Sequence, residues 1–290
     1  MIGIGINTTL RAMGGGGAPF VGLLDTYPNA AAAYSVRKLR SAYTGSAIRV
    51  RRSSDNAEQN IGFTALGNLD TTALTSFCSG TNGFVTTWYD QSGNINNIIQ
   101  STAVNQPQIV SSGNLLLQNT NPTIQFDGVN DNLGTTFNTQ PTFPITLITI
   151  NKTSGLTDAG IVGFGSNGAS REEFWQEVTT LGKLKFGCYA DDLASGFPTG
   201  SFANTYLLYS LIITSTFVQN GFGNGTSVGT YNGGGQYVGN RSFNIGKGRQ
   251  DVLGKFINGN IQEVIIYPSD QTTTRTGIES NINKKRNPEK

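Results

Sequence analysis

Short runs of alternating apolar and polar residues make up most of the chain beyond residue 83. The runs are rich in β-branched and aromatic residues, and clusters of Gly, Asn and Asp separate them. Regular spacing of this kind predicts an all-β sandwich or barrel rather than units that alternate strand and helix. The predicted strands cover residues 84–89, 123–126, 145–150, 161–164, 184–189, 206–214, 243–245 and 261–267.

Three stretches follow a helical pattern instead. Ala30–Tyr43 is rich in Ala and has apolar residues at partly helical spacing. Asp70–Cys78 begins with a residue type that caps the first turn of a helix. Gln271–Lys284 has Ile278 and Ile282 four residues apart, which gives that helix an apolar inner face. The sequence thus predicts a β-sandwich with a few short helices.

The first 20 residues differ from the rest, because four consecutive glycines, Gly14–Gly17, lie within them. Gly-rich segments are flexible and become ordered only where something holds them. We therefore divide the chain into an N-terminal arm, residues 1–20, and a single domain, residues 21–290. The arm is expected to anchor the chain to other subunits of an assembly. It lacks the basic start and long apolar stretch of a secretory signal.

Composition narrows the function. Only 13% of the 290 residues are charged and 38 are glycine, so neutral polar residues must cover most of the surface. The net charge of +2 argues against nucleic-acid binding, which needs a clustered basic face. The absence of histidine excludes Ser-His-Asp and Cys-His catalysis and argues against a metal site of the zinc type. No apolar run is long enough to span a membrane. Cys78 and Cys188 are two cysteines only, so free and bridged thiols both remain open.

Two segments in the first third of the chain carry a recognisable pattern. The first is Leu39–Asp55; the second joins Phe77 and Cys78 to Phe84–Asn94, which ends in Tyr-Asp-Gln-Ser-Gly-Asn. Together they resemble the catalytic domain of the arabinofuranosidase B family, a β-sandwich glycoside hydrolase. Residues 243–267 are similar to the closing strands of laminin-G-like and concanavalin-like modules. The resemblance implies a concanavalin-like jelly-roll β-sandwich.

The same resemblance implies where catalytic residues would lie. Retaining hydrolysis needs a nucleophilic carboxylate and an acid/base carboxylate about 5 Å apart. The nucleophile would be Glu173 or Glu177, and the acid/base would be Asp251. This chain departs from the family pattern there, because Asp251 is displaced from the position after Gly246 that matches the acid/base. The pair of adjacent cysteines that the family has beside its pocket is also missing from residues 161–165. We therefore lean against catalysis.

Four charged residues of the matched segments are expected to brace the structure. Arg49 and Arg51 lie close to Asp55 in the sequence, and Asp90 begins the second matched turn. Arginine and carboxylate side chains form paired, charge-assisted hydrogen bonds that fix loops. We expect this bracing role rather than a chemical one.

A carbohydrate-facing surface is predicted from aromatic and acidic residues of the second half. Trp175 and Tyr189 can stack on a sugar, and Asp191 and Asp192 can accept hydrogen bonds from its hydroxyl groups. The two aspartates could also hold Ca²⁺ in a loop, although no cofactor is the simpler expectation.

The leading hypothesis combines these features into a non-catalytic virion or surface-displayed structural protein. It would be a bacteriophage spike, fibre or capsid-associated component, located on the virion surface or outside a cell. It would bind a cell-surface glycan in host attachment, join other subunits through residues 1–20 and form a homo-oligomer. One alternative is a retaining α-L-arabinofuranosidase, and another is a purely structural capsid or spike subunit without a ligand.

Overall fold

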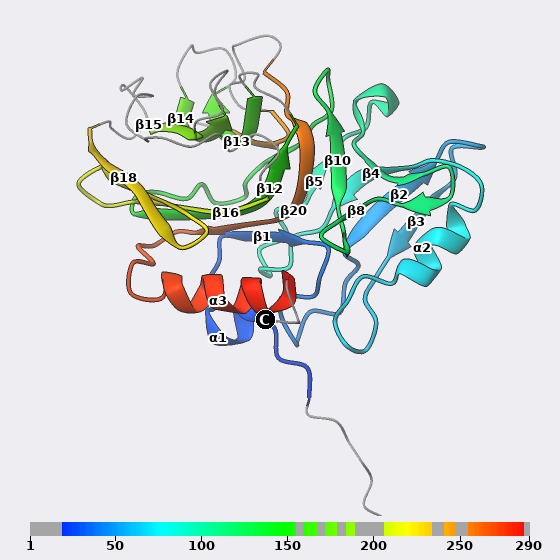
Figure 1. Ribbon diagram of the computed structural model, residues 1–290, viewed down its shortest axis with the longest axis horizontal. Coiled ribbons are helices and arrows are strands. Elements are labelled where there is room, and N and C mark those ends of the chain that lie inside the picture. The colour runs from blue at the N-terminus through cyan, green and yellow to red at the C-terminus, as the bar shows by residue number, and fades with distance from the viewer. Residues whose placement is uncertain are drawn as a thin grey trace, which may run out of the picture.

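Two packed β-sheets form the body of the molecule, with short helices outside them (Figure 1). The computed structural model describes residues 19–154, 159–166, 172–178, 184–188, 206–233, 241–247 and 255–286. The predicted all-β jelly-roll sandwich with a few short helices is confirmed. Residues 1–18 of the predicted arm lie outside the described residues.

The first sheet is antiparallel and runs β18-β17-β16-β12-β20. Along the remaining edge of β20, β10 and β1 follow one another, each paired with a different part of that strand. Its longest pairing joins β12 to β20, where Thr146 faces Tyr267 and Thr153 faces Gly259. The strands are β1 (Ala32–Ser35), β10 (Ile124–Asp127), β12 (Ile145–Thr153), β16 (Leu207–Ile213), β17 (Val218–Gly223), β18 (Thr226–Asn232) and β20 (Asn258–Tyr267).

The second sheet runs β3-β2-β4, continues through β5 to β11, and then follows the order β19-β13-β14-β15. A single pair, Gln125 with Gln108 of β6, links β10 of the first sheet to the second. The strands are β2 (Ile48–Arg52), β3 (Glu58–Ile61), β4 (Gly83–Trp88), β5 (Ile98–Ile99), β6 (Gln108–Ser111), β7 (Asn114–Leu115), β11 (Leu133–Thr136), β13 (Ala159–Ser166), β14 (Glu172–Val178), β15 (Leu184–Cys188) and β19 (Arg241–Ile245). A small hairpin, β8 (Leu117–Gln118) with β9 (Asn121–Pro122), stands apart from both sheets.

The main core fills the space between the two sheets. Aromatic rings from both layers meet there: Tyr34 of β1 stacks on Phe243 of β19 at 6.0 Å between ring centroids and lies 6.1 Å from Trp88 of β4. All three side chains are fully buried. Aromatic pairs of this kind add a specific geometry to the burial of apolar area. The core therefore fixes how the sheets lie on one another.

A second apolar cluster lies on the outer side of the first sheet. Helices α1 (Leu23–Thr26) and α3 (Arg275–Arg286) lie side by side there (Figure 1). Ile278 and Ile282 of α3 are fully buried against Ile148 and Ile265 of the sheet. The predicted C-terminal helix and its inner face are confirmed, although the helix begins at Arg275.

The prediction of a helix over Ala30–Tyr43 is wrong, because this stretch contains β1. All four residues of β1 are buried, and each pairs with a residue of β20. Intrinsic preference is a weak influence that tertiary pairing overrides. The predicted helix at Asp70–Cys78 is confirmed as α2 (Thr71–Phe77), and the Asp70 carboxylate accepts the backbone N–H of Ala73. No described helix is long and apolar enough to cross a membrane.

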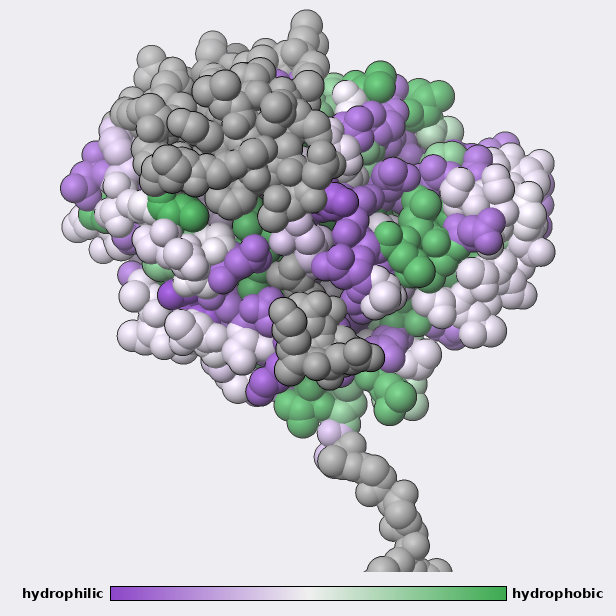
Figure 2. Space-filling view, in the orientation of Figure 1, coloured by the Kyte–Doolittle hydropathy of each residue, from purple (hydrophilic) through white to green (hydrophobic). Residues whose placement is uncertain are grey.

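The exterior is neutral and polar. Figure 2 shows the described surface of one face mainly in white and purple, with apolar residues in small separate patches. This distribution agrees with the low charged fraction of 13%.

Candidate active site

The strand β14 carries three of the residues that the sequence picked for chemistry, namely Glu173, Trp175 and Glu177. Its backbone pairs with β13 on one side and β15 on the other. Asp251 lies outside the described residues. The same holds for Tyr189, Asp191 and Asp192.

The pairing register separates the two candidate nucleophiles. Glu177 pairs with Gly160 of β13. Val162, two residues further along β13, pairs with Ile245 at the end of β19. Lys247, two residues beyond Ile245, begins the connection to β20 in which Asp251 lies. The backbone at Glu177 is therefore at the end of the sheet from which that connection starts. Glu173 is four residues further along the strand, or about 13 Å at the usual rise.

A buried polar chain holds β14 against the first sheet. Gln176, which follows Trp175 and precedes Glu177, is fully buried. Its Oε1 accepts a hydrogen bond of 2.9 Å from the Thr149 hydroxyl of β12. Asn151 Nδ2 donates to the same hydroxyl at 3.0 Å. Hydrogen bonds in a buried environment fix the positions of the groups that make them. These hydrogen bonds therefore fix the position of β14 immediately beside Glu177.

One hydrogen-bond donor of this buried polar group of residues has no acceptor. Among the described residues, Gln176 Nε2 is buried without a hydrogen-bond partner. A buried amide donor without a partner costs roughly 1–3 kcal/mol. Such a group is tolerated where a buried water molecule satisfies it.

In the interior of the sandwich, the row of paired residues that contains Thr149 is polar, whereas the row before it is aliphatic. In the register, Thr149 faces Tyr209 of β16, and Tyr209 faces Gly223 of β17. Neighbouring rows are aliphatic, as with Leu147 opposite Leu211. Burial raises the pKa of Tyr209 well above its usual range, so its hydroxyl stays protonated. The row thus offers neutral hydroxyl and amide groups, which suit a sugar better than an ion.

The sequence contained a signal for this network that our prediction missed. The β12 segment Ile145–Thr153 reads Ile-Thr-Leu-Ile-Thr-Ile-Asn-Lys-Thr. Its alternate positions are aliphatic up to Leu147 and then polar at Thr149 and Asn151. Polar residues on the buried face of a strand indicate a buried polar site.

The predicted bracing residues have other partners than the sequence proximity implied. Arg49 pairs with Glu58 across β2 and β3 through an ion pair of 2.5 Å. Arg52, not Arg49 or Arg51, forms the two-pronged pair with Asp55, at 2.8 and 2.6 Å. That guanidinium holds the pKa of Asp55 down to about 2.

Arg51 holds a loop without any carboxylate. Its Nε donates to Gln106 Oε1 at 2.7 Å, and its two other nitrogens donate to Asn56 Oδ1 and the Ala103 carbonyl. It also lies over the ring of Phe84, 5.1 Å from the centroid.

The side chains of Asp90 and Gln91 in the Tyr-Asp-Gln-Ser-Gly-Asn motif bind backbone groups rather than arginine. Asp90 is buried, and its carboxylate accepts the backbone N–H groups of Ala33, Ser92 and Asn96. Gln91 is also buried; it accepts from the Leu39 N–H and donates to two carbonyls beside β1. The motif therefore fixes the strand β1 and the chain that follows it at the edge of the first sheet.

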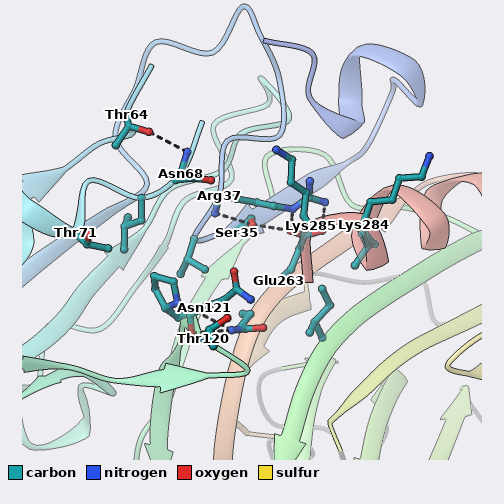
Figure 3. A pocket seen from close by; sticks show the side chains of 16 residues that line it. Ser35, Arg37, Thr64, Asn68, Thr71, Thr120, Asn121, Glu263, Lys284 and Lys285 are labelled. Atoms are coloured by element: carbon teal, nitrogen blue, oxygen red, sulfur yellow. Dashed lines mark hydrogen bonds and ion pairs between the residues drawn. The ribbon is translucent and has the colours of Figure 1, made fainter. Parts of the chain in front are cut away.

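A cavity of about 620 Å³ lies between β1, β20, α3 and the β8–β9 hairpin (Figure 3). A buried ion pair forms one wall, in which Arg37 bonds both carboxylate oxygens of Glu263 at 2.7 and 2.9 Å. Ser35 donates to Glu263 as well, and Arg37 reaches Asn281 of α3. Because these groups satisfy one another, the wall joins β1, β20 and α3 and leaves few polar atoms for a ligand.

No group of three or more metal-ligating side chains occurs among the residues that the structure describes. Calcium at Asp191 and Asp192 stays a prediction, since both lie outside that part of the chain.

Comparison with known proteins finds similarity to arabinofuranosidases. The family profile "Alpha-L-arabinofuranosidase B, catalytic" matches residues 25–128. A probable α-L-arabinofuranosidase B of Aspergillus terreus is 40% identical over 100 residues, which is 32% of this chain and 20% of that protein. An α-L-arabinofuranosidase of Hypocrea jecorina is 40% identical over 74 residues, 26% of this chain and 15% of that protein. The matched region is thus a small part of these relatives.

Solved structures extend the likeness to most of the fold. An arabinofuranosidase in complex with arabinofuranosyl-α-1,2-xylobiose superposes with a TM-score of 0.66 at 17% identity, covering 87% of this chain and 62% of that one. A GH54 α-L-arabinofuranosidase soaked with a cyclic sulfate inhibitor gives 0.65 with the same coverage. At this identity the likeness concerns the fold alone.

These findings correct the leading hypothesis. The prediction of a non-catalytic bacteriophage virion or structural protein is wrong, because the matching profile and the curated relatives are arabinofuranosidases. The resemblance to the arabinofuranosidase B catalytic domain is confirmed over residues 25–128. The low fraction of charged residues and the Gly-rich arm were weak grounds for predicting a virion protein, because neither feature excludes an enzyme that acts on neutral sugars.

Proposed function

We propose that this protein is a retaining glycoside hydrolase of the α-L-arabinofuranosidase type. The observation that carries the proposal is the match of the arabinofuranosidase B catalytic profile to residues 25–128. The shared fold over 87% of the chain supports it.

Glu177 is our candidate for the nucleophile and Asp251 for the acid/base. Glu177 is preferred to Glu173 because its backbone lies at the end of the sheet where the connection that carries Asp251 begins. The buried anchor at Gln176 also fixes the strand immediately beside Glu177. A nucleophile must be held in place to within a fraction of an ångström, and such anchors supply that precision.

The reaction would proceed in two displacements. The Glu177 carboxylate attacks the anomeric carbon of the arabinofuranosyl group, while Asp251 gives its proton to the departing glycosidic oxygen. Asp251, now ionised, takes a proton from water as the water attacks the same carbon. The ester to Glu177 breaks, arabinose leaves with its original configuration, and Asp251 is protonated again.

Trp175, Tyr189, Asp191 and Asp192 are proposed to contact the sugar. An aromatic face can pack on the C–H surface of a sugar ring, and carboxylates can accept its hydroxyl protons. Substrates of this kind are carried by polysaccharides outside cells, so the proposal includes an extracellular location.

The test is release of nitrophenol from 4-nitrophenyl α-L-arabinofuranoside, compared between Glu177→Gln and Glu173→Gln. These two variants are matched in chemistry and lie on the same strand. We expect E177Q to lower kcat/KM by about 10³-fold or more, and E173Q to retain activity within about 10-fold. An arabinofuranosyl electrophile that traps the nucleophile should modify the peptide that contains Glu177.

Two results would overturn parts of the proposal. Loss of activity in E173Q with retention in E177Q would move the nucleophile to Glu173. A wild-type protein that cleaves no arabinofuranoside and is not labelled by the electrophile would contradict the hydrolase assignment itself.

A further inference from the structure

A groove with many polar lining residues extends from the outer face of the second sheet to β10 and β20 of the first sheet. It consists of two cavities, of about 710 Å³ and 530 Å³, that share Gln106 as a lining residue. One cavity reaches Phe84 of β4 and Asn258 of β20, and the other reaches Tyr89 at the end of β4. We call these two cavities together the outer groove.

Amide side chains in fixed orientations line the outer groove. Gln106 is buried and held by Arg51 and by the carbonyl of Gln100. Gln100 in turn donates to the backbone carbonyl and the side chain of Asn132. Gln108 donates to the Val110 carbonyl. Groups that are already ordered lose little entropy when a ligand binds, so the lining is pre-organised for recognition.

Exposed apolar residues gather at the same place. Val104 lines the first cavity and is 73% exposed, and Ile99 lines the second and is 57% exposed. Val129 is 67% exposed and lies in the loop between the lining residues Asp127 and Asp131. Exposed apolar side chains that cluster beside a cavity mark a binding surface more often than single ones do. A surface with apolar rims and amide walls matches the two kinds of surface of a pyranose ring.

The carboxylates of the groove leave acceptor atoms open. Asp127 Oδ1 accepts the N–H groups of Val129, Asn130 and Asp131, and Asp131 Oδ2 accepts the N–H of Asp127. The other oxygen of each carboxylate has no hydrogen bond within the described residues. Carboxylate oxygens are strong acceptors for the hydroxyl groups of a ligand.

The charges of the groove disfavour an anionic ligand. Each arginine is engaged by the protein, Arg49 by Glu58 and Arg51 by Gln106. The remaining charges are the carboxylates of Asp127 and Asp131, which would repel an anion. Because no described residue of the groove offers a free cation, the groove suits a ligand rich in hydroxyl groups better than an anion.

We propose that the outer groove binds the uncharged main chain of a polysaccharide, and so holds the polymer on the enzyme while side groups are cut elsewhere. This inference rests on the proposed function for its biological sense, although the binding itself needs no catalysis. Two adjoining cavities suit an extended chain of several pyranose units better than a single sugar.

The experiment measures retardation of the protein in a native gel that contains soluble neutral arabinoxylan, for Val104→Glu, Gln108→Ala and the control Leu66→Glu. Leu66 is 73% exposed, as Val104 is, and lines neither cavity. We expect V104E and Q108A to weaken the apparent affinity by about fivefold or more, which is about 1 kcal/mol each. Relative to its own migration in a gel without polysaccharide, L66E should be retarded as much as the wild type is. Cleavage of the nitrophenyl arabinofuranoside should be unchanged in all three, while kcat/KM on the polymer falls in V104E and Q108A.

Equal retardation of V104E, Q108A and the wild type would overturn the proposal, as would absence of retardation in the wild type. An equal loss on the small substrate and on the polymer would also overturn it, because the residues would then act on the active site. Failure of the proposed function looks different: the gel shift persists while no arabinofuranoside is cleaved.

Discussion

Replacing Asp131 by Asn should remove a pH-dependent loss of stability. Asp131 is 6% exposed, and its carboxylate accepts the backbone N–H of Asp127. Burial, reinforced by the charge of Asp127, raises the pKa of Asp131 from 3.8 to about 6. The substitution keeps a side-chain oxygen for the Asp127 N–H and removes only the ionisation.

The sign follows from proton binding. Between pH 3.8 and about 6 the folded state holds the Asp131 proton more tightly than the unfolded state does. Stability therefore falls as the pH rises through this window, and the full cost is present above pH 6. A shift of about 2 pKa units corresponds to about 3 kcal/mol, and partial access to water makes about 1–3 kcal/mol the expected range.

The assay is urea unfolding at pH 4, 5, 6 and 7 for the wild type and Asp131→Asn. The difference in free energy of unfolding between the two should change by about 1–3 kcal/mol in favour of the variant between pH 4 and pH 7. Asp55→Asn is the control, because Arg52 lowers the pKa of Asp55 to about 2 and the sign is reversed. For Asp55 the wild type loses stability relative to its variant as the pH falls from about 4 toward 2. A difference for D131N that stays constant between pH 4 and pH 7 would refute the reasoning.

Three further changes test the packing. Replacing one partner of the buried ion pair, by Arg37→Met or Glu263→Gln, should lower the free energy of urea unfolding by about 3–5 kcal/mol. The double variant should lose less free energy of unfolding than the two single variants lose together. Additive losses would argue against direct coupling of the two side chains. Gly259→Ala brings a Cβ to 2.2 Å from the Lys152 carbonyl oxygen, so the melting temperature should fall by an amount equivalent to about 1–3 kcal/mol, and an unchanged melting temperature would contradict this. Asp90→Ala removes the acceptor of several buried backbone amides. Amide hydrogen exchange in β1 should therefore become faster, and the free energy of unfolding should fall by about 1–3 kcal/mol. Unchanged exchange rates in β1 would refute the role of Asp90 in holding this strand.

The sequence pattern predicted the strands well where one face is buried and the other is not. Ile124–Asp127 alternates buried and exposed residues and forms β10 as expected. The pattern failed for β1, because all four of its residues are buried and no alternation remains. A strand that is covered on both faces loses the two-residue period on which such a prediction depends, even at the edge of a sheet.

The candidate site was predictable in part. Glutamates of β14 emerged from the family resemblance alone, since a carboxylate on a strand looks the same whether it is catalytic or solvated. The anchor between Gln176 and Thr149 joins residues 27 positions apart. Such a contact depends on how two sheets pack, and no local pattern encodes that packing. The polar residues of β12 nevertheless indicated that something polar lay opposite them.

Low charge limits what the protein can bind, and it says nothing about what the protein does to the bound molecule. A surface of amides and hydroxyls with 13% charged residues suits neutral sugars, whether the protein only binds them or also cleaves them.

Binding and cleavage differ in one distance, because retaining hydrolysis needs two carboxylates about 5–5.5 Å apart. Such a pair contributes only two residues to the composition of a 290-residue chain. Composition therefore favoured display and cleavage equally, and the decision had to come from residues 25–128, where the arabinofuranosidase pattern is strongest. The same reasoning separates the two sites proposed above. The proposed catalytic site depends on the positions of the carboxylates of Glu177 and Asp251, whereas the outer groove depends only on shape and hydrogen bonding. Substitutions in the outer groove should therefore change affinity for a polymer and leave the chemical step untouched.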